Sequence, residues 1–248
     1  MSRLHVGLAA CGLAVVGVLA FAGAATSQDV VKSPTMDKIK QRGELMCGTD
    51  TGIPGYSYQD SKGEWLGLDV DLCRGIADAL LGSPAKVKFL GITTKVRFSV
   101  LQSREIDLLV HNSELTFVRN TQLGLDEPAI NFFAAQTFMV RKSLNVAHAK
   151  DLNGATICLL SGSTLETNIA DYNRANNIKI NTLLFDRPEE AFAAADAGRC
   201  DGYTDGGSVA VARSTMKKPG DWSCPRQSAG CNRLARTCAG ATWPGRGW

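Results

Sequence analysis

The chain lacks an excess of charge of either sign. Its 27 Lys and Arg residues stand against 24 Asp and Glu residues, so the formal net charge is only +3. Nucleic-acid-binding domains usually carry a strongly basic face. Much of the small excess lies near the end of the chain, where four arginines after Pro219 face one acid, Asp221. The charge balance therefore gives no indication of a nucleic-acid partner.

Recognisable arrangements of metal-binding or catalytic side chains are also lacking. None of the eight cysteines has the close paired spacing of a zinc site. His111 and His148 have no recognisable Ser or Cys partner, and we interpret both as polar surface residues. Asp69 and Asp71 fit the acidic first turn of a helix better than an acid–base pair. The sequence thus predicts no metal, no cofactor and no catalytic residues.

The first 25 residues have the composition of an export signal. Arg3 precedes an apolar run at 6–22, and small residues with an Ala-x-Ala spacing follow at Ala22 and Ala24. This order is typical of a secretory signal peptide that is cleaved near Ala24 or Ala25. The apolar run is short for a membrane anchor. We therefore expect an exported protein, in which disulfide bonds can form.

Apolar strands alternate with amphipathic helices through most of the remaining chain. Such alternation predicts a parallel sheet that is covered by helices. Strands are predicted at 44–49, 86–92, 106–110, 155–160, 178–185 and 200–204, and helices at 70–81, 96–102, 163–174, 188–197 and 207–214. An extended run at 132–141 interrupts the series. We therefore predict two α/β lobes, 26–139 and 140–216, joined near residues 137–141.

Residues 217–248 depart from this pattern. They hold three of the four tryptophans, three of the eight cysteines and many Gly, Pro and Arg residues, with no period of 2 or 3.6. We expect this atypical tail to be an out-of-frame reading or an assembly error rather than part of the fold. A genuine cysteine-rich tail is the alternative.

The stretch Leu108–Asn120, LLVHNSELTFVRN, has the features of an anion site. An apolar strand leads into polar residues, and Thr116 is placed to cap a helix whose first turn contains Arg119. A cation at a helix N-terminus is unfavourable on dipole grounds, unless it shares an anion with the free backbone N–H groups there. We therefore predict a carboxylate or phosphate site. An arginine solvated on the helix surface is the alternative.

Other loops that follow predicted strands carry matching chemistry. Residues 48–56 form a Gly/Pro loop, and the turn Ser161–Thr164, SGST, begins a helix and can offer backbone amides to an anion. Asp205 directly follows a strand, and its carboxylate suits an ammonium group. Ligand sites of α/β sheets lie at such strand ends. An arginine and helix amides for a carboxylate, with an acid for an ammonium, together predict a free amino acid as the ligand.

Six segments that carry these features occur in a recognisable order. They are GTDTGIPGYSY at 48–58, the run Gly67–Leu72, LQSREIDLLVHNSELTFVR at 101–119, QTFMVRKSLNV at 136–146, the SGST turn and AGRCDGYTD at 197–205. Across residues 36–216 this order resembles the family-3 periplasmic solute-binding proteins of ABC transporters, in particular the general L-amino-acid-binding branch. The resemblance implies a two-lobe α/β fold of the periplasmic-binding-protein type II class, which closes on its ligand.

The resemblance assigns the ligand's α-carboxylate to residues of both lobes. Arg119 would clamp the carboxylate, and Thr116 would cap the helix that carries Arg119. Ser163 and Thr164 would contact the same carboxylate from the second lobe.

The remaining ligand contacts are assigned in the same way. Asp205 would receive the α-ammonium group, and Tyr56 would stand in the aromatic wall of the first lobe. Glu114 replaces the Ser or Thr that the family often has, so we expect it to favour basic ligands over acidic ones. Ile53 stands where many members have a stacking aromatic residue, which hints at a broad ligand range. The sequence does not predict which amino acids bind.

The family pattern also bears on the cysteines and on the end of the chain. Cys47 would pair with Cys73 and Cys158 with Cys200, each within one lobe, although sequence alone does not fix the connectivity. The family continues with a part that returns to the first lobe and supplies a second connecting strand. Residues 217–248 match none of it. We therefore expect a fold that is incomplete at its C-terminus, with an exposed sheet edge and apolar face on the first lobe.

The function that the resemblance implies is binding rather than catalysis. The protein would act in the periplasm as a monomer, capture L-amino acids and deliver them to the membrane permease of an ABC transporter. A dehydratase-type enzyme on the same fold is one alternative, with Glu114 and Asp205 as its candidate acid or base. A sensory receptor domain is another. Fold alone does not decide among these.

Overall fold

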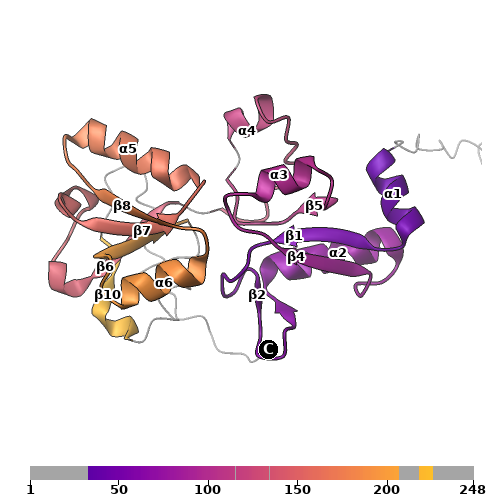
Figure 1. The fold of residues 1–248 in the computed structure, drawn as a ribbon, viewed down its shortest axis with the longest axis horizontal. Helices are drawn as coiled ribbons and strands as arrows, with labels where there is room; N and C mark the ends of the chain where they lie inside the picture. Colours follow the sequence, from indigo (N-terminus) through magenta and orange to yellow (C-terminus); the bar gives the residue numbers. More distant parts are fainter. Residues whose placement is uncertain (1–32, 115, 134, 207–217, 226–248) are drawn as a thin grey trace, which may run out of the picture.

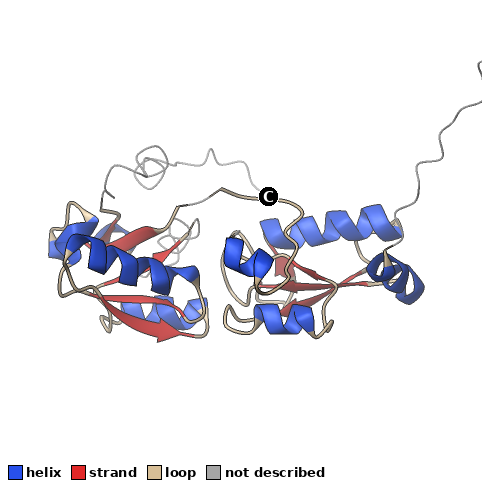
Figure 2. Cartoon of the chain, turned by 90° about the horizontal axis from the view of Figure 1, so that it is seen from above, coloured by secondary structure: helices blue, strands red, loops and turns tan. Residues whose placement is uncertain are grey.

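Parallel strands and their covering helices form two lobes that lie side by side (Figure 1). The computed structural model describes residues 33–114, 116–133, 135–206 and 218–225. In both lobes helices cover both faces of the sheet (Figure 2). The predicted α/β architecture of two lobes is therefore confirmed. The predicted signal peptide, the predicted helix at 207–214 and the tail after residue 225 lie outside the described residues.

Lobe 1 is built on a three-stranded parallel sheet in the order β4-β1-β5. Its elements are α1 (Pro34–Arg42), β1 (Leu45–Thr49), β2 (Tyr58–Gln59), β3 (Trp65–Leu66), α2 (Leu68–Leu81), β4 (Val87–Gly91), α3 (Arg97–Gln102), β5 (Leu108–Leu109) and α4 (Phe117–Thr121). Helix α2 buries Val70, Cys73 and Ala77 at helical spacing and ends at Gly82, whose φ of 72° suits a left-handed C-cap. One core of lobe 1 therefore lies between α2 and the sheet.

Lobe 2 is a five-stranded mixed sheet in the order β10-β6-β9-β7-β8. Its elements are β6 (Thr137–Arg141), η1 (Lys142–Leu144), η2 (Ala149–Leu152), β7 (Thr156–Leu160), α5 (Thr164–Asn176), β8 (Asn181–Phe185), α6 (Pro188–Asp196), β9 (Gly202–Asp205), η3 (Pro219–Asp221) and β10 (Trp222–Ser223). Alternate side chains of β7 point to opposite faces. Ile157 and Leu159 pack with α5, and Cys158 and Leu160 pack with α6, so the two helices cover opposite faces (Figure 1).

The boundary between the lobes differs from the prediction. Residues 137–141 do not connect the lobes but form β6, which pairs with β9. Phe138, Met139 and Val140 are buried in the two cores of lobe 2. The connection lies at 122–136, where the described residues form neither helix nor strand. An extended apolar run looks alike in a connection and in a central strand, so the sequence pattern did not separate the two.

The first part of the predicted tail also belongs to lobe 2. Strand β10 pairs antiparallel with β6, with Trp222 opposite Arg141. The Trp222 side chain is fully buried in the core beneath α6, and the guanidinium carbon of Arg141 lies 4.7 Å from the ring centroid. The prediction that lobe 2 ends at residue 216 is therefore wrong for residues 218–225. A two-residue strand is too short to show a period in the sequence.

Each disulfide bond lies within one lobe. Cys47 of β1 is joined to Cys73 of α2, and Cys158 of β7 is joined to Cys200, which precedes β9. The bonds close loops with sequence separations of 26 and 42 residues. Both therefore restrict the unfolded chain and tie an inner strand of a sheet to its surroundings.

Lobe 1 and the connection expose several large apolar side chains. The exposed fraction is 82% for Phe117, 76% for Phe133 and 54% for Ile130. Such a surface favours association with other apolar groups. No helix in the described part of the chain is long and apolar enough to cross a membrane.

Candidate ligand site between the lobes

The two lobes touch at the carboxyl ends of their parallel strands. We call this region the lobe junction and define it by the loops 50–57, 92–97, 110–116 and 161–164 and by the end of β9 at Asp205. Across it, Asn112 Nδ2 donates to Asp205 Oδ1 at 3.3 Å, and Arg97 Nη1 donates to Gly162 O at 3.5 Å. A side chain at Gly162 would place its Cβ 3.0 Å from the Cα of Lys95. The lobes are therefore in direct contact here.

Arg119 is held at the start of α4. The hydroxyl of Thr116 accepts a hydrogen bond from the Arg119 backbone N–H at 3.2 Å, so Thr116 is the N-cap that the sequence predicts. The Arg119 residue is only 6% exposed, and its guanidinium carbon lies 4.8 Å from the centroid of the Phe98 ring. The alternative of an arginine solvated on the helix surface is thus excluded.

The anion beside Arg119 in this structure is Glu114. Nη1 of Arg119 donates to the backbone carbonyl of Glu114 and lies 3.4 Å from Glu114 Oε2. The Glu114 side chain is 41% exposed, whereas that of Arg119 is 8% exposed. The carboxylate therefore approaches the buried guanidinium from the solvent side, where a ligand carboxylate would have to compete with it.

Asp205 lies at the end of β9 and is almost fully buried. Its carboxylate accepts hydrogen bonds from the Tyr203 hydroxyl at 2.9 Å, from the backbone N–H of Gly206 at 2.7 Å and from Asn112 of lobe 1. These bonds fix the carboxylate at the junction. Through Asn112 it faces lobe 1.

Tyr56 lies in the loop after β1 and is buried. Its ring packs edge to face against Phe132 of the connection, with centroids 5.4 Å apart. Burial raises the pKa of the Tyr56 hydroxyl, and the negative charges of Asp205 and Asp69 raise it further. The phenol therefore stays neutral.

Ser163 and Thr164 begin α5 on the lobe 2 side. The Ser163 residue is in the N-cap position, but its hydroxyl donates to the carbonyl of Leu160 at 2.7 Å instead of capping the helix. The backbone N–H of Gly162 donates to Glu166 Oε1 at 2.7 Å. The Ser163 hydroxyl and the Gly162 backbone N–H of the SGST turn thus form hydrogen bonds within lobe 2.

His111 contradicts the sequence interpretation as a surface residue. Its side chain is fully buried two residues after the end of β5, and its Nε2 lies 3.1 Å from the carbonyl of Ile92 and 3.2 Å from Asp50 Oδ2. Burial, together with the charge of Arg97, lowers the pKa of His111 to about 4. His148, the other residue so interpreted, is exposed. A histidine at the end of a buried strand cannot reach the solvent. Its position in the sequence, just after an apolar run, could therefore have indicated that it is buried.

Asp50 is a second buried polar residue that the sequence did not lead us to predict. It directly follows β1, and its Oδ1 accepts from the backbone N–H of Thr51 at 2.6 Å. Burial raises its pKa to about 6, against the lowering effect of that hydrogen bond and of one from Gly52. Near neutral pH the pair with His111 is therefore a carboxylate beside a neutral imidazole. The position of Asp50 at the end of a strand could have indicated that it belongs to the site.

Arg97 is the third missed residue. It is fully buried at the start of α3, and its Nε donates to Ser113 Oγ at 2.8 Å. Burial lowers its pKa to about 10, and the positive charge of Arg119 contributes in the same direction. The signal that marked Arg119, an arginine in the first turn of a helix after a strand, applies equally to Arg97.

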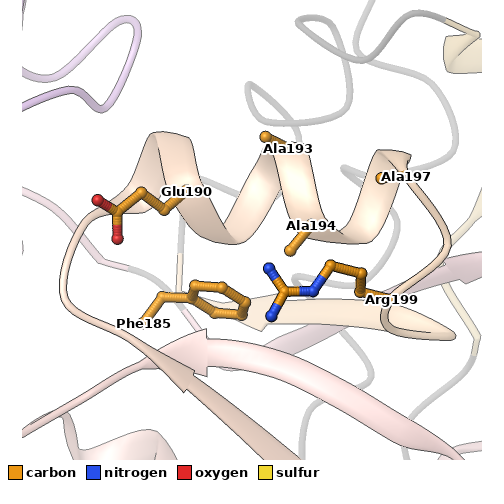
Figure 3. Close-up of a pocket in the computed structure, with 6 residues that line it drawn as sticks. All are labelled: Phe185, Glu190, Ala193, Ala194, Ala197 and Arg199. Carbon is orange, nitrogen blue, oxygen red and sulfur yellow. The ribbon is translucent and has the colours of Figure 1, made fainter.

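A separate hollow lies on lobe 2 between α6 and the adjacent chain. Its volume is about 390 Å³, and it is lined by Phe185, Glu190, Ala193, Ala194, Ala197 and Arg199. Figure 3 shows the Arg199 guanidinium beside the Phe185 ring, with its carbon 5.6 Å from the ring centroid. None of the seven predicted ligand residues lines this hollow, so it is not part of the junction.

The fold and the junction define a two-lobe α/β protein, and comparison with known proteins identifies its family. Residues 45–218 match the model of the bacterial extracellular solute-binding proteins, family 3. The chain therefore belongs to that family, and both the resemblance and the predicted fold class are confirmed.

Named relatives cover most of this chain but are longer than it. The general L-amino acid-binding periplasmic protein AapJ of Rhizobium johnstonii is 43% identical over 212 residues, which are 85% of this chain and 60% of AapJ. The glutamate/glutamine/aspartate/asparagine-binding protein BztA of Rhodobacter capsulatus is 42% identical over 80% of this chain and 59% of its own length. The chain thus spans about 60% of the length of these relatives.

A solved structure shows the same fold. The ABC transporter periplasmic binding protein from Brucella ovis with glutathione bound has a TM-score of 0.75 and is 42% identical, over 79% of this chain and 62% of that one.

Proposed function

We propose that this protein is a periplasmic receptor that captures free L-amino acids between its lobes. It would act as a monomer and deliver the ligand to the membrane permease of an ABC transporter. The observation that carries the proposal is the pair of buried charges at the junction, Arg119 from lobe 1 and Asp205 from lobe 2. A zwitterion offers each of them a partner of opposite sign. The names of AapJ and BztA, both amino-acid-binding proteins, support this ligand class.

The seven predicted ligand residues take the roles that their positions allow. Arg119 holds the α-carboxylate, with the first turn of α4 fixed by Thr116, and Ser163 and Thr164 approach from lobe 2. Asp205 holds the α-ammonium group. Export to the periplasm rests on the predicted signal peptide and on the periplasmic location in the name of AapJ.

The two other predicted residues border the ligand. Tyr56 walls the site from lobe 1, where its ring packs on Phe132. Glu114 shares Arg119 with the ligand carboxylate and adds negative charge near the ligand's ammonium or side chain. Beside Glu114 a basic group of the ligand would therefore be favoured over an acidic one, so an acidic group would have to lie elsewhere in the site.

A dehydratase is the second candidate. The chain is similar to an ancestral amino-acid-binding protein described as a precursor of cyclohexadienyl dehydratase, at 26% identity and a TM-score of 0.68. The acid or base would have to be Glu114 or Asp205. Glu114 faces Arg119, and Asp205 accepts hydrogen bonds from Tyr203, Asn112 and Gly206. Because both carboxylates are engaged by groups of the chain itself, we favour binding over turnover.

Binding is best measured in two forms of the chain, because it spans about 60% of the relatives' length. One form is residues 26–248, and the other continues with the part of AapJ that lies beyond the match. L-amino acids should raise the melting temperature of the extended form, with a weaker response of the shorter form. Mass spectrometry should recover the amino acids and a prephenate-type acid unchanged. The proposal fails if no amino acid raises the melting temperature of either form. It also fails if an amino acid or the prephenate-type acid is dehydrated.

The variant Arg119→Ala tests the carboxylate clamp. Removing one partner of a buried charged pair should weaken binding by about 2–5 kcal/mol, which is roughly 30- to 4,000-fold in Kd. Arg174→Ala is the matched control, since Arg174 is 78% exposed in α5 and pairs only with Asp171 among the described residues. Calorimetry that shows equal affinities for both variants would remove Arg119 from the site.

A further inference from the structure

Arg97 is a buried cation that the proposed amino-acid contacts leave unused. Its Nε and Nη1 donate to Ser113 Oγ and to the carbonyls of Thr94 and Gly162. Its Nη2 is buried and has no hydrogen-bond partner among the described residues. A guanidinium offers five N–H donors in a fixed fork, and a buried donor without an acceptor is costly. An acceptor that bonds to Nη2 of Arg97 would therefore stabilise this guanidinium.

No carboxylate of the described residues forms an ion pair with Arg97. The guanidinium is fully buried, so solvent does not offset its charge. The charge of Arg119 acts with burial to lower the pKa of Arg97, whereas the charges of Glu114 and Asp50 raise it. Neither acid forms a hydrogen bond with Nη2 of Arg97, which therefore still has no acceptor among the described residues.

The positions of the two guanidinium groups limit what that acceptor can be. The carbon of Arg97 lies 4.3 Å and that of Arg119 lies 4.8 Å from the centroid of the same ring, Phe98. They cannot be further apart than the sum of these distances. A small molecule with a second acceptor group a few bonds from its α-carboxylate has a length that suits this separation.

We propose that Arg97 is a specificity-determining residue that binds a second acceptor group of the ligand, a carboxylate or carboxamide at the end of a short side chain. The inference rests on the proposed amino-acid function. The α-carboxylate lies at Arg119, and the side-chain oxygen lies at the free edge of the Arg97 fork. The contact of Arg97 with Gly162 of lobe 2 places this second group where the lobes meet.

The test compares two ligands in three proteins, each in whichever of the two forms binds amino acids. L-Glutamate carries the second acceptor, and L-leucine has a side chain of similar length without it. Arg97→Met keeps the apolar stem and removes the charge. Arg74→Met is the matched control, because Arg74 also lies over a phenylalanine of lobe 1, with 5.7 Å to the Phe89 centroid, but donates to Trp65 O away from the junction.

Isothermal titration should show that Arg97→Met weakens L-glutamate binding by about 30-fold or more and changes L-leucine binding by less than about 3-fold. The control should leave both affinities unchanged. Equal losses for the two ligands would make Arg97 a structural residue and overturn the proposal, as would an unchanged glutamate affinity. If L-leucine binds the unsubstituted protein and L-glutamate does not, the side-chain site is refuted while the amino-acid function stands. If no amino acid binds, the proposed function itself fails.

If Arg97→Met fails to fold, Arg97→Lys replaces it. Lysine keeps the positive charge but loses the fork, so glutamate binding should fall by a smaller factor and leucine binding should stay unchanged. A lysine variant that loses both ligands equally again argues for a structural role.

Discussion

His111→Asn should change how the stability of the protein depends on pH. Burial lowers the pKa of His111 from 6.5 to about 4 in the folded protein. As pH falls below 6.5, the unfolded chain takes up a proton that the folded protein refuses. The histidine therefore supports the fold above pH 6.5, and this support is lost as pH falls toward 4. At about 1.4 kcal/mol per pKa unit, the full loss is about 3 kcal/mol.

Two acids act in the opposite direction over nearly the same range. Burial raises the pKa values of Asp50 and Asp69 from 3.8 to about 6. As pH falls through 6, the folded protein protonates these acids before the unfolded chain does, which stabilises the fold. In the unsubstituted protein the opposing effects offset each other in part. In His111→Asn only the acids remain, so its stability should rise between pH 6 and pH 4 relative to the unsubstituted protein.

Urea unfolding of both proteins from pH 4 to pH 7.5 checks this sign. The free energy of unfolding of the unsubstituted protein minus that of the variant should fall by up to about 3 kcal/mol as pH is lowered. His148→Asn is the matched control, because His148 is exposed in lobe 2, and it should follow the unsubstituted protein. A difference that stays constant within about 0.5 kcal/mol across the range would show that His111 is not buried beside Asp50.

Two further predictions follow from lobe 2 and from Glu114. Trp222→Ala should lower the free energy of unfolding of lobe 2 by about 3–5 kcal/mol, because it empties a fully buried site beneath α6. Urea unfolding measures this, and an unchanged midpoint would place residues 218–225 outside the fold. Glu114→Thr should raise the affinity for glutamate relative to arginine, because it removes a carboxylate 3.4 Å from Arg119 Nη1. Competition calorimetry gives the ratio, and a constant ratio means that Glu114 does not face the ligand.

Local rules were sufficient for the parts of the fold that one segment determines. The cap at Thr116 follows from the need of a helix start for a side-chain acceptor. The end of α2 follows from a glycine that tolerates positive φ. Strand β7 follows from a short apolar run between turn residues. Each of these depends on neighbours within a few positions along the chain.

Contacts between distant segments explain what the sequence did not predict. His111 and Asp50 are far apart in the chain, and only the pairing of β5 with β1 brings them together. Arg97 depends on lobe 2 for one of its acceptors, Gly162. Trp222 is buried only because β6 offers an open strand edge beside it. His111 and Asp50 could be suspected from their places near strand ends, but the partners of these residues could not.

The central claim is that Arg119 holds the α-carboxylate of an amino acid between the lobes, and a paired change of protein and ligand tests it most directly. Isothermal titration compares L-leucine with L-leucinamide, which lacks the charged carboxylate, in the unsubstituted protein and in Arg119→Ala. In the unsubstituted protein the amide should bind weaker by about 2–5 kcal/mol. In Arg119→Ala that difference should nearly vanish, because the partner of the carboxylate is gone. If the amide loses as much affinity in the variant as in the unsubstituted protein, another group holds the carboxylate and the claim is wrong.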